Sequence, residues 1–405
     1  MRNCFAIAAA ALVLAVAGPA LGQETPSATL GVSGPEEMVF DWAKQACVKS
    51  HVPDAPARAF RDSEGKVHLI ASHNDNRRFS GPDLNHLQPE CAVIYQAKKS
   101  NVLGQYDDMG WISGLWTGDG KTVYALAHME LRGNRAPGLC SNKSYSSCLL
   151  NTVTALVSRD GGKNFAPETG PGAGPMVANL PYPFPNDRNA RVGYANPTNI
   201  IQRDGWYYAM VFADGYRDQK RGNCVLRTRD LGDPSSWRAW DGKEFSVQFI
   251  DPFRQQTANA KDHVCAPVST NKIGRMIGSI SEHRGSGEVI AVFGDRRTED
   301  GKTASGIYAS TSRDLVNWSE PRLIFEAPLL WEKSCGADGR VFYPALLDPN
   351  AKAPSFQDTG DNAFIYFTRY RLTGCKVTWD RDLVRVPVTI SMGGTAKGQG
   401  GGTAQ

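Results

Sequence analysis

Three side chains that can carry a proton or hold an anion follow one apolar run of the sequence. In "ALAHMELRG", which covers residues 125–133, His128, Glu130 and Arg132 lie within five residues of one another. An imidazole beside a carboxylate can perform general acid–base chemistry, and an arginine can hold an anionic group. The same cluster can also be an ordinary solvated strand end. The choice depends on whether this end of the strand faces a binding site.

Four other apolar runs end in the same kinds of residue. Their ends include His73, Asp75, Asp214, Arg217, Asp295, Arg296 and Arg369. The segments that begin the preceding runs contribute Asp54, Arg58, Trp111 and Asn199. The turns at the opposite ends hold mainly Gly, Asp and Ser, which are turn formers. We therefore expect the residues that could take part in catalysis or binding to lie together on one side of the fold.

The elements that must position these residues are strands, repeated in five units. The second unit reads "WISGLWTGDGKTVYALAHMELRG" from Trp111 and then "TVTALVSRDGGKNF" from Thr152. Each unit combines a strand, a tight Gly/Asp turn, a second strand, a polar loop and a third strand, which is the pattern of linked hairpins. Repeated small units of this kind indicate a radial array, because none can bury both of its faces alone.

We predict an all-β fold, a five-bladed β-propeller with a short N-terminal helix. The helix is expected within residues 35–48, where apolar residues recur at helical spacing. A two-sheet sandwich is the alternative, although it does not require the same order of strands and turns five times.

The turn after a third strand carries a recognisable motif. "SRDGGKNF" from Ser158 fits the Asp-box pattern, and "SRDLVNW" from Ser312 is similar. The carboxylates of Asp160 and Asp314 can accept hydrogen bonds from backbone N–H groups of their loops. We expect a structural role for both residues.

A blade is an antiparallel meander, so the starts of its innermost strands and its loops between strands 2 and 3 share one face. Side chains on that face converge on the propeller axis, where five blades can surround one ligand. His128 and Glu130 are expected there together with Asp54 and His73.

The N-terminus indicates export. Residues 1–22 combine a short basic start, an apolar run and a small-x-small cleavage site, as in a secretory signal peptide. We divide the rest into an N-terminal segment with the helix (23–50), the propeller (51–392) and a flexible tail (393–405). No later apolar run is long enough to span a membrane. The expected location is secreted or periplasmic.

Cysteine content and charge further limit the kinds of protein and partner that the sequence allows. Eight of the nine cysteines follow residue 22, and an even number in an exported chain indicates disulfides. Proximity suggests Cys140 with Cys148 and Cys335 with Cys375. No C-x-x-C pair is present, so we expect neither a zinc-thiolate site nor another metal in the active site, and no cofactor beyond at most a structural Ca²⁺. The net charge of +4 is spread without a basic block, which disfavours nucleic acid as a partner.

The chain resembles the five-bladed glycoside hydrolases, the families of β-xylosidases and arabinanases. The resemblance rests on the blade pattern over most of the mature chain, on "PDAPARAF" at the first blade and on "STSRDLVNWSEP" in a later one. The Asp-box turns are also similar to those of sialidases, which have six blades. The sequence offers five blades and no clear set of three carboxylate-binding arginines.

The resemblance implies paired carboxylates, because glycosidic cleavage needs one ionised and one protonated carboxyl group. Asp54 matches the first position, as base or nucleophile. Glu130 is our choice of acid, and Asp214 is the third carboxylate, with Asp75 and Asp295 as substitutes. The family places its acid at an innermost-strand start where this chain has Asn196. His128 or His73 is therefore an alternative acid–base group.

The remaining candidates are expected to bind substrate. They are Arg58, His73, Asp75, Trp111, Asn199, Arg217, Asp295, Arg296 and Arg369. We expect a monomeric, secreted glycosidase that cleaves an oligo- or polysaccharide. A non-catalytic carbohydrate-binding propeller and a sialidase-like or phosphorolytic enzyme are the alternatives. The last of these would show an arginine cluster around a carboxylate or phosphate.

Overall fold

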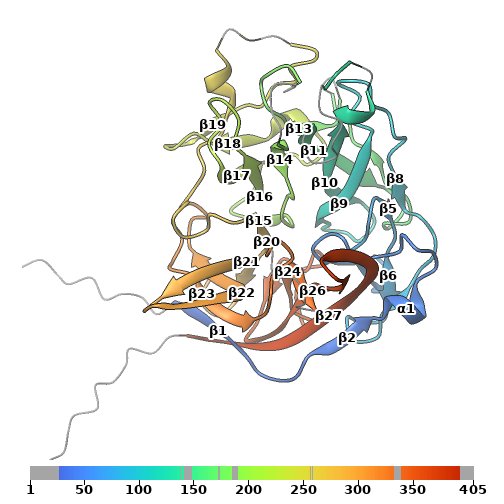
Figure 1. Ribbon diagram of the computed structural model, residues 1–405, viewed down its shortest axis with the longest axis vertical. Coiled ribbons are helices and arrows are strands. Elements are labelled where there is room, and N and C mark those ends of the chain that lie inside the picture. The colour runs from blue at the N-terminus through green and yellow to red at the C-terminus, as the bar shows by residue number, and fades with distance from the viewer. Residues whose placement is uncertain are drawn as a thin grey trace, which may run out of the picture.

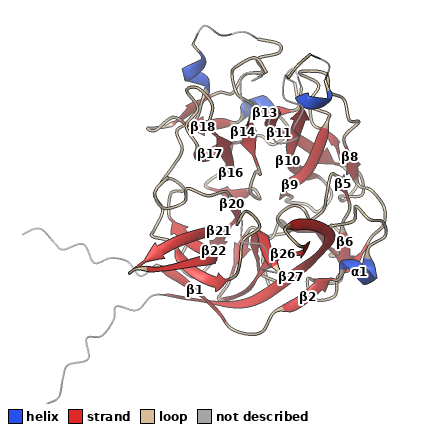
Figure 2. Ribbon diagram, viewed as in Figure 1, coloured by secondary structure: helices blue, strands red, loops and turns tan. Residues whose placement is uncertain are grey.

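The computed structural model describes residues 27–392 except 137, 141–147, 172–173, 185–189, 256, 258 and 333–338. The expected signal peptide and tail lie outside the described residues. Almost all regular structure is β-strand, and the short helices lie at the periphery (Figure 2). No helix among the described residues is long and apolar enough to cross a membrane.

The strands form five antiparallel blades, as expected (Figure 1). Blade 1 consists of β3 (Arg58–Arg61), β4 (Val67–Ile70), β6 (Phe79–Gly81) and β7 (Gln88–Pro89). Blade 2 consists of β9 (Met109–Trp116), β10 (Val123–Arg132) and β11 (Leu149–Ser158), with β12 (Ala166–Pro167) and β13 (Met176–Ala178) both on β11. Blade 3 consists of β14 (Val192–Ala195), β15 (Ile201–Arg203), β16 (Trp206–Asp214), β17 (Gly222–Thr228), β18 (Arg238–Trp240) and β19 (Phe245–Val247).

The last two blades complete the ring. Blade 4 consists of β20 (Ile277–His283), β21 (Val289–Glu299), β22 (Lys302–Ser312) and β23 (Arg322–Glu326). Blade 5 consists of β24 (Arg340–Leu347), β26 (Asn362–Thr373), β27 (Lys376–Met392), β1 (Ala28–Val32) and β2 (Glu37–Phe40). The remaining elements are β5 (Asp75–Asn76), β8 (Tyr95–Gln96), β25 (Asp358–Thr359), α1 (Trp42–Gln45), η1 (Gly133–Arg135), η2 (Pro234–Ser236) and η3 (Ala260–His263).

The ring is closed by the beginning of the described chain. Strand β1 pairs with β27 from Ala28 opposite Met392 to Val32 opposite Val388. Figure 1 shows β1 beside β27 at the edge of blade 5. Residues expected to precede the propeller therefore form part of its last blade.

The helix expected within residues 35–48 is much shorter than the apolar spacing suggested. Strand β2 occupies the first part of this segment, and only Trp42–Gln45 is helical. Strand β2 forms in place of a longer helix because β27 has an open edge with which it can pair. Glu37 of β2 lies opposite Arg385 of β27. Their side chains form an ion pair at 2.6 Å, and Phe40 is fully buried.

The hydrophobic core is divided into five clusters, each between two neighbouring blades. Leu126 and Val211 represent the contact between blades 2 and 3, and Met210 and Phe293 that between blades 3 and 4. The other three clusters join blades 4 and 5, 5 and 1, and 1 and 2. Apolar burial is the main favourable term in folding, so each blade is stabilised chiefly by its two neighbours.

The Asp-box turns have the expected structural role. Asp160 accepts hydrogen bonds from the backbone N–H groups of Lys163 and Asn164, each at 3.0 Å. Asp314 accepts from the N–H groups of Val316 and Asn317 at 2.9 and 2.7 Å. Both carboxylates fix the turn that follows the third strand of a blade.

Disulfides add covalent links to this frame. The expected Cys140–Cys148 bond is present, together with Cys47–Cys91 and Cys224–Cys265. Cys375 is also disulfide-bonded, whereas its expected partner Cys335 lies outside the described residues. Such bonds persist mainly in oxidising compartments.

Arg58 lies fully buried at the axis, where it joins four blades. Its guanidinium donates hydrogen bonds to the carbonyl oxygens of Ser113, of Gly278 at 2.7 Å and of Pro197 at 3.4 Å. Burial lowers the pKa of Arg58 to about 9, which still leaves the side chain charged at neutral pH. The substrate-binding role expected for Arg58 is therefore reassigned to a structural one, because its donors are used by the backbone.

We predict that Arg58→Met lowers the free energy of unfolding by about 3 kcal/mol, because buried carbonyls of three other blades lose their donor. Arg58→Lys is expected to restore only part of this, since one ammonium cannot reach all the acceptors. Urea unfolding followed by tryptophan fluorescence measures both effects. Arg322→Met, at an exposed position of β23, is the control; an equal effect of both Met variants would contradict the axial role.

Candidate active site

The candidate site lies where the inner strands begin, at one end of the axis. On blade 2, Trp111 of β9 is paired with His128 of β10, and Met109 is paired with Glu130. Asp54 precedes β3, and His73 follows β4. The start of each inner strand therefore lies beside the end of the second strand, as the meander requires, and this places the expected residues together.

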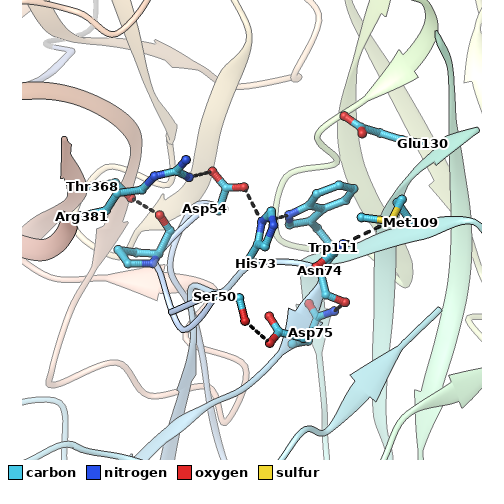
Figure 3. A network of polar contacts seen from close by, with 12 residues as sticks. Ser50, Asp54, His73, Asn74, Asp75, Met109, Trp111, Glu130, Thr368 and Arg381 are labelled. Carbon is cyan, nitrogen blue, oxygen red and sulfur yellow. Dashed lines mark hydrogen bonds and ion pairs between the residues drawn. The ribbon is translucent and has the colours of Figure 1, made fainter. Parts of the chain in front are cut away.

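Three rings form a wall through the site. The Trp111 indole packs edge-on against His73, with ring centroids 5.6 Å apart, and against His128 at 5.7 Å. Trp111 is 7% exposed, so it is mainly a packing element. Figure 3 shows Asp54 and Glu130 on either side of Trp111.

Asp54 accepts hydrogen bonds from three side chains. Arg381 donates at 2.6 Å, His73 approaches through Nδ1 at 2.7 Å and the Tyr370 hydroxyl lies at 3.5 Å. The partners come from β4's end, β26 and β27, so the carboxylate is fixed from two blades. A carboxylate oriented in this way is suited to act as a base or nucleophile.

The proton on His73 follows from this contact. Nδ1 must carry a proton to donate to the Asp54 carboxylate at 2.7 Å. The indole N–H of Trp111 also points at Nδ1, at 3.3 Å. Both contacts cannot be hydrogen bonds at once, and the shorter one to an anion is the stronger. The Trp111 contact is therefore mainly van der Waals packing.

His128 has the opposite arrangement. The backbone N–H of Asn196 lies 3.0 Å from Nδ1, and the side-chain oxygen of Asn196 lies 3.2 Å from the same nitrogen. The two contacts require opposite tautomers; a backbone N–H can only donate and its contact is the shorter, so we assign Nδ1 as the unprotonated nitrogen. The proton then lies on Nε2, which is buried without a hydrogen-bond partner and is 3.8 Å from Oε1 of Glu130. A neutral imidazole thus faces a carboxylate.

Burial is the main cause that lowers the pKa of His128, and the nearby charge of Glu130 opposes it. Glu130 is itself held by Arg132, whose terminal nitrogen lies 2.9 Å away. This side of the site therefore contains a neutral imidazole and a carboxylate with its own arginine.

Asn196 and Tyr343 have left-handed backbone conformations, with φ angles of 43° and 57°. Non-glycine residues rarely adopt such values, and those that do often lie at functional sites. Burial and then the charge of Asp54 raise the pKa of Tyr343, and Glu130 acts in the same direction. The charges of both carboxylates thus raise the pKa of Tyr343.

Asp214 is the last residue of β16 in blade 3. Its carboxylate is 3.1 Å from Arg191 and 3.9 Å from Arg221. Burial raises the pKa of Asp214 despite both arginines. Asp214 and His128 influence each other's pKa, which places Asp214 beside the site.

Several expected binding residues are engaged with protein partners. Asp75 pairs with Arg77 and accepts from Ser50 at 2.7 Å. Asp295 is held by Arg275 at 3.1 Å and Arg297 at 2.8 Å. In this structure both acids bind arginine side chains of the protein.

The other expected binding residues, three arginines and Asn199, also contact groups of the protein. Arg296 pairs with Glu332 at 3.6 Å and Arg369 pairs with Glu36. Arg217 stacks over Tyr182 at 5.0 Å. Asn199 exchanges two hydrogen bonds with the backbone of Ile280, at 2.7 and 3.0 Å, so we reassign it to the joint between blades 3 and 4.

Sequence reasoning missed three residues at the site, namely Tyr370, Trp379 and Arg381. Arg381 is paired with Tyr370 across β26 and β27 and stacks over its ring at 5.0 Å. Trp379 lies edge-on to His73 at 5.7 Å and is 37% exposed. The alternation of Trp379 and Arg381 in "VTWDRD" indicates a shared strand face, but nothing local points to Asp54.

No group of three or more His, Cys, Asp or Glu residues in the described part of the chain could hold a metal ion.

The fold and these contacts define a five-bladed propeller with a carboxylate- and histidine-lined site at its axis. No protein-family profile and no curated protein sequence matches the chain. Solved structures of glycoside hydrolases are similar to it. The catalytic domain of a GH62 α-L-arabinofuranosidase from Coprinopsis cinerea is 10% identical, covers 89% of this chain and 96% of its own, and has a TM-score of 0.48.

Two further structures are similar. The α-L-arabinanase of Cellvibrio cellulosa complexed with arabinohexaose is 10% identical, covers 82% of this chain and 91% of its own, and has a TM-score of 0.43. For the endo-arabinase of Bacteroides thetaiotaomicron the values are 11%, 90%, 99% and 0.44. Likeness at this level does not determine chemistry.

The lowered pKa of His128 predicts a pH effect on stability. The unfolded chain takes up a proton on this side chain near pH 6.5, before the folded protein does, so the free energy of unfolding falls as the pH drops below about 6.5. His128→Asn should reduce this fall, which urea unfolding at several pH values measures.

His51, whose pKa burial lowers to about 4, and His68 contribute in the same direction. The variant should therefore keep part of the pH dependence. Identical slopes in the wild type and His128→Asn would contradict a neutral, buried His128.

Proposed function

We propose that the protein is an exported glycoside hydrolase that cleaves an oligo- or polysaccharide at the mouth of the propeller axis. The observation that carries this proposal is the pair of carboxylates, Asp54 and Glu130, which flank the ring wall of His73, Trp111 and His128. Hydrolysis of a glycosidic bond needs two carboxyl groups on either side of the bond.

Asp54 is the proposed base or nucleophile. Its oxygens are oriented by Arg381 and His73. Arg381 cannot accept a proton, whereas His73, which donates through Nδ1, keeps an unprotonated Nε2. The Asp54 carboxylate remains the proposed base or nucleophile, and His73 is the alternative acceptor of the proton that an activated water would release.

Glu130 is the proposed acid: in its protonated form it donates a proton to the leaving oxygen, and it takes a proton from solvent after the product leaves. His128, whose Nε2 lies 3.8 Å from Glu130, is neutral and adds no positive charge beside this acid. Asp214, whose pKa is raised by burial, is placed to influence the charge of His128. It is the proposed third carboxylate.

A carbohydrate-binding protein without turnover is the second candidate, and Trp379 favours it. This indole is 37% exposed beside His73, and exposed aromatic rings at a polar mouth offer a stacking surface for sugars. The two candidates share a ligand class and differ only in the use of the carboxylates. In both, we propose a monomer that acts outside the cytoplasm.

We predict that Asp54→Asn and Glu130→Gln each lower kcat by roughly 10²–10⁴-fold, because each removes one acid–base group. Binding of the same glycan should remain within a few-fold of the wild type. The measurements are release of reducing ends from a panel of plant and microbial polysaccharides, and calorimetric binding of the resulting oligosaccharides.

Glu64→Gln is the matched control, because Glu64 is an exposed carboxylate in the turn between β3 and β4. Its turnover should equal that of the wild type. Glycan binding by a wild type that releases no product would favour the binding protein, and full turnover of either site variant would refute the assigned pair.

A further inference from the structure

A second hollow adjoins the candidate site on blades 3, 4 and 5. Its volume is about 320 Å³, and three arginines line it together with aromatic and apolar side chains: Arg191, Arg221, Arg275, Trp331 and Phe342. Ligand pockets have volumes of about 300–1,000 Å³, so the hollow is large enough for one sugar unit.

The three arginines are held from behind by buried acids. Nε of Arg191 lies 3.1 Å from Asp214, Nε of Arg221 lies 3.9 Å from the same carboxylate, and Nε of Arg275 lies 3.1 Å from Asp295. The arginine side chains are 58%, 54% and 41% exposed, whereas the two acids are 11% and 8% exposed. The acids thus hold the Nε edge of each guanidinium.

The positive charges outnumber the negative ones. Two carboxylates, Asp214 and Asp295, pair with the three guanidinium groups that line the hollow, and Asp295 also pairs with Arg297 outside it, at 2.8 Å. Guanidinium groups bind carboxylates and sulfates through paired, charge-assisted hydrogen bonds, so an anion would complete the arrangement.

Residues of the hollow contact residues of the candidate active site. The Asn196 side chain, whose backbone N–H binds His128, contacts Met276 of the hollow at 2.6 Å. Phe342 of the hollow packs against Tyr343 with ring centroids 4.5 Å apart. A sugar in the hollow would therefore be a neighbour of a sugar at the catalytic mouth.

We propose that this hollow is a subsite for a sugar that carries an anionic group, a uronate carboxylate or a sulfate ester, next to the bond that is cleaved. The terminal nitrogens of Arg191, Arg221 and Arg275 bind the anion, and Phe342 and Trp331 cover the apolar face of the ring. This inference rests on the proposed function and narrows its substrate to acidic glycans.

The test compares charged and neutral forms of the same oligosaccharides. Glu130→Gln protein is titrated calorimetrically with uronate oligosaccharides from pectin, alginate and glucuronoxylan, with their methyl esters and with sulfated galactan oligosaccharides. The acidic form should bind about tenfold or more tightly than its ester, and Arg191→Gln or Arg275→Gln should remove about tenfold of that affinity.

Arg159→Gln is the control, because Arg159 also pairs with a buried acid, Glu168 at 2.8 Å, but lies beside an Asp-box turn. It should leave the affinity unchanged, and thermal unfolding verifies that every variant is folded. Tighter binding of the sulfated oligosaccharides alone would assign the anion as sulfate and support the subsite. Equal affinities for acids and esters, no binding of any anionic probe, or unchanged affinity in the arginine variants would overturn it.

The outcome separates this inference from the proposed function. Charge-dependent binding that needs the arginines, without cleavage by the wild type, would remove the hydrolase and leave the subsite. Cleavage of neutral glycans without preference for charge would remove the subsite and leave the hydrolase.

Discussion

A buried guanidinium at the axis, that of Arg58, is the interaction on which the rest of the propeller depends. Its hydrogen bonds reach carbonyl groups of the inner strands or loops of three other blades. A desolvated charge without a carboxylate is costly unless every donor finds an acceptor. The axis can therefore adopt few other arrangements, and the inner strands begin at a fixed distance from one another.

Buried asparagines extend the same principle around the ring. Asn76 donates to Gly110 at 2.9 Å and accepts from Ile112 at 2.8 Å, so it joins blades 1 and 2. Asn199 does the same for blades 3 and 4. Amide side chains can pair with both backbone groups of a neighbouring strand. Such joints satisfy polar groups where blades splay apart near the axis, and the five apolar clusters supply the stabilising burial further out.

The site above this frame is organised by charge. Each acid that faces the mouth or the adjoining hollow is fixed by at least one arginine: Asp54 by Arg381, Glu130 by Arg132 and Asp214 by Arg191. These pairs orient both partners, because the planar guanidinium binds in a fixed direction. His128 sits among them, and because burial lowers its pKa it adds no charge at neutral pH. The charge of the site is therefore set by the acids and their arginines.

Strand alternation and turn chemistry are local properties, so the blade pattern, the Asp-box turns and the placement of Trp111 and His128 on one face could be predicted from the sequence. The sequence also placed Asp54 and His73 in the same region. Only the three-dimensional structure shows which arginine is structural and which arginine binds the Asp54 carboxylate. Arg58 is buried in the axis, whereas Arg381, which is 327 residues from Asp54 in the chain, binds that carboxylate. It likewise decided that β1 completes the last blade. Contacts between distant segments depend on how the blades close into a ring, and no spacing within one blade contains that information.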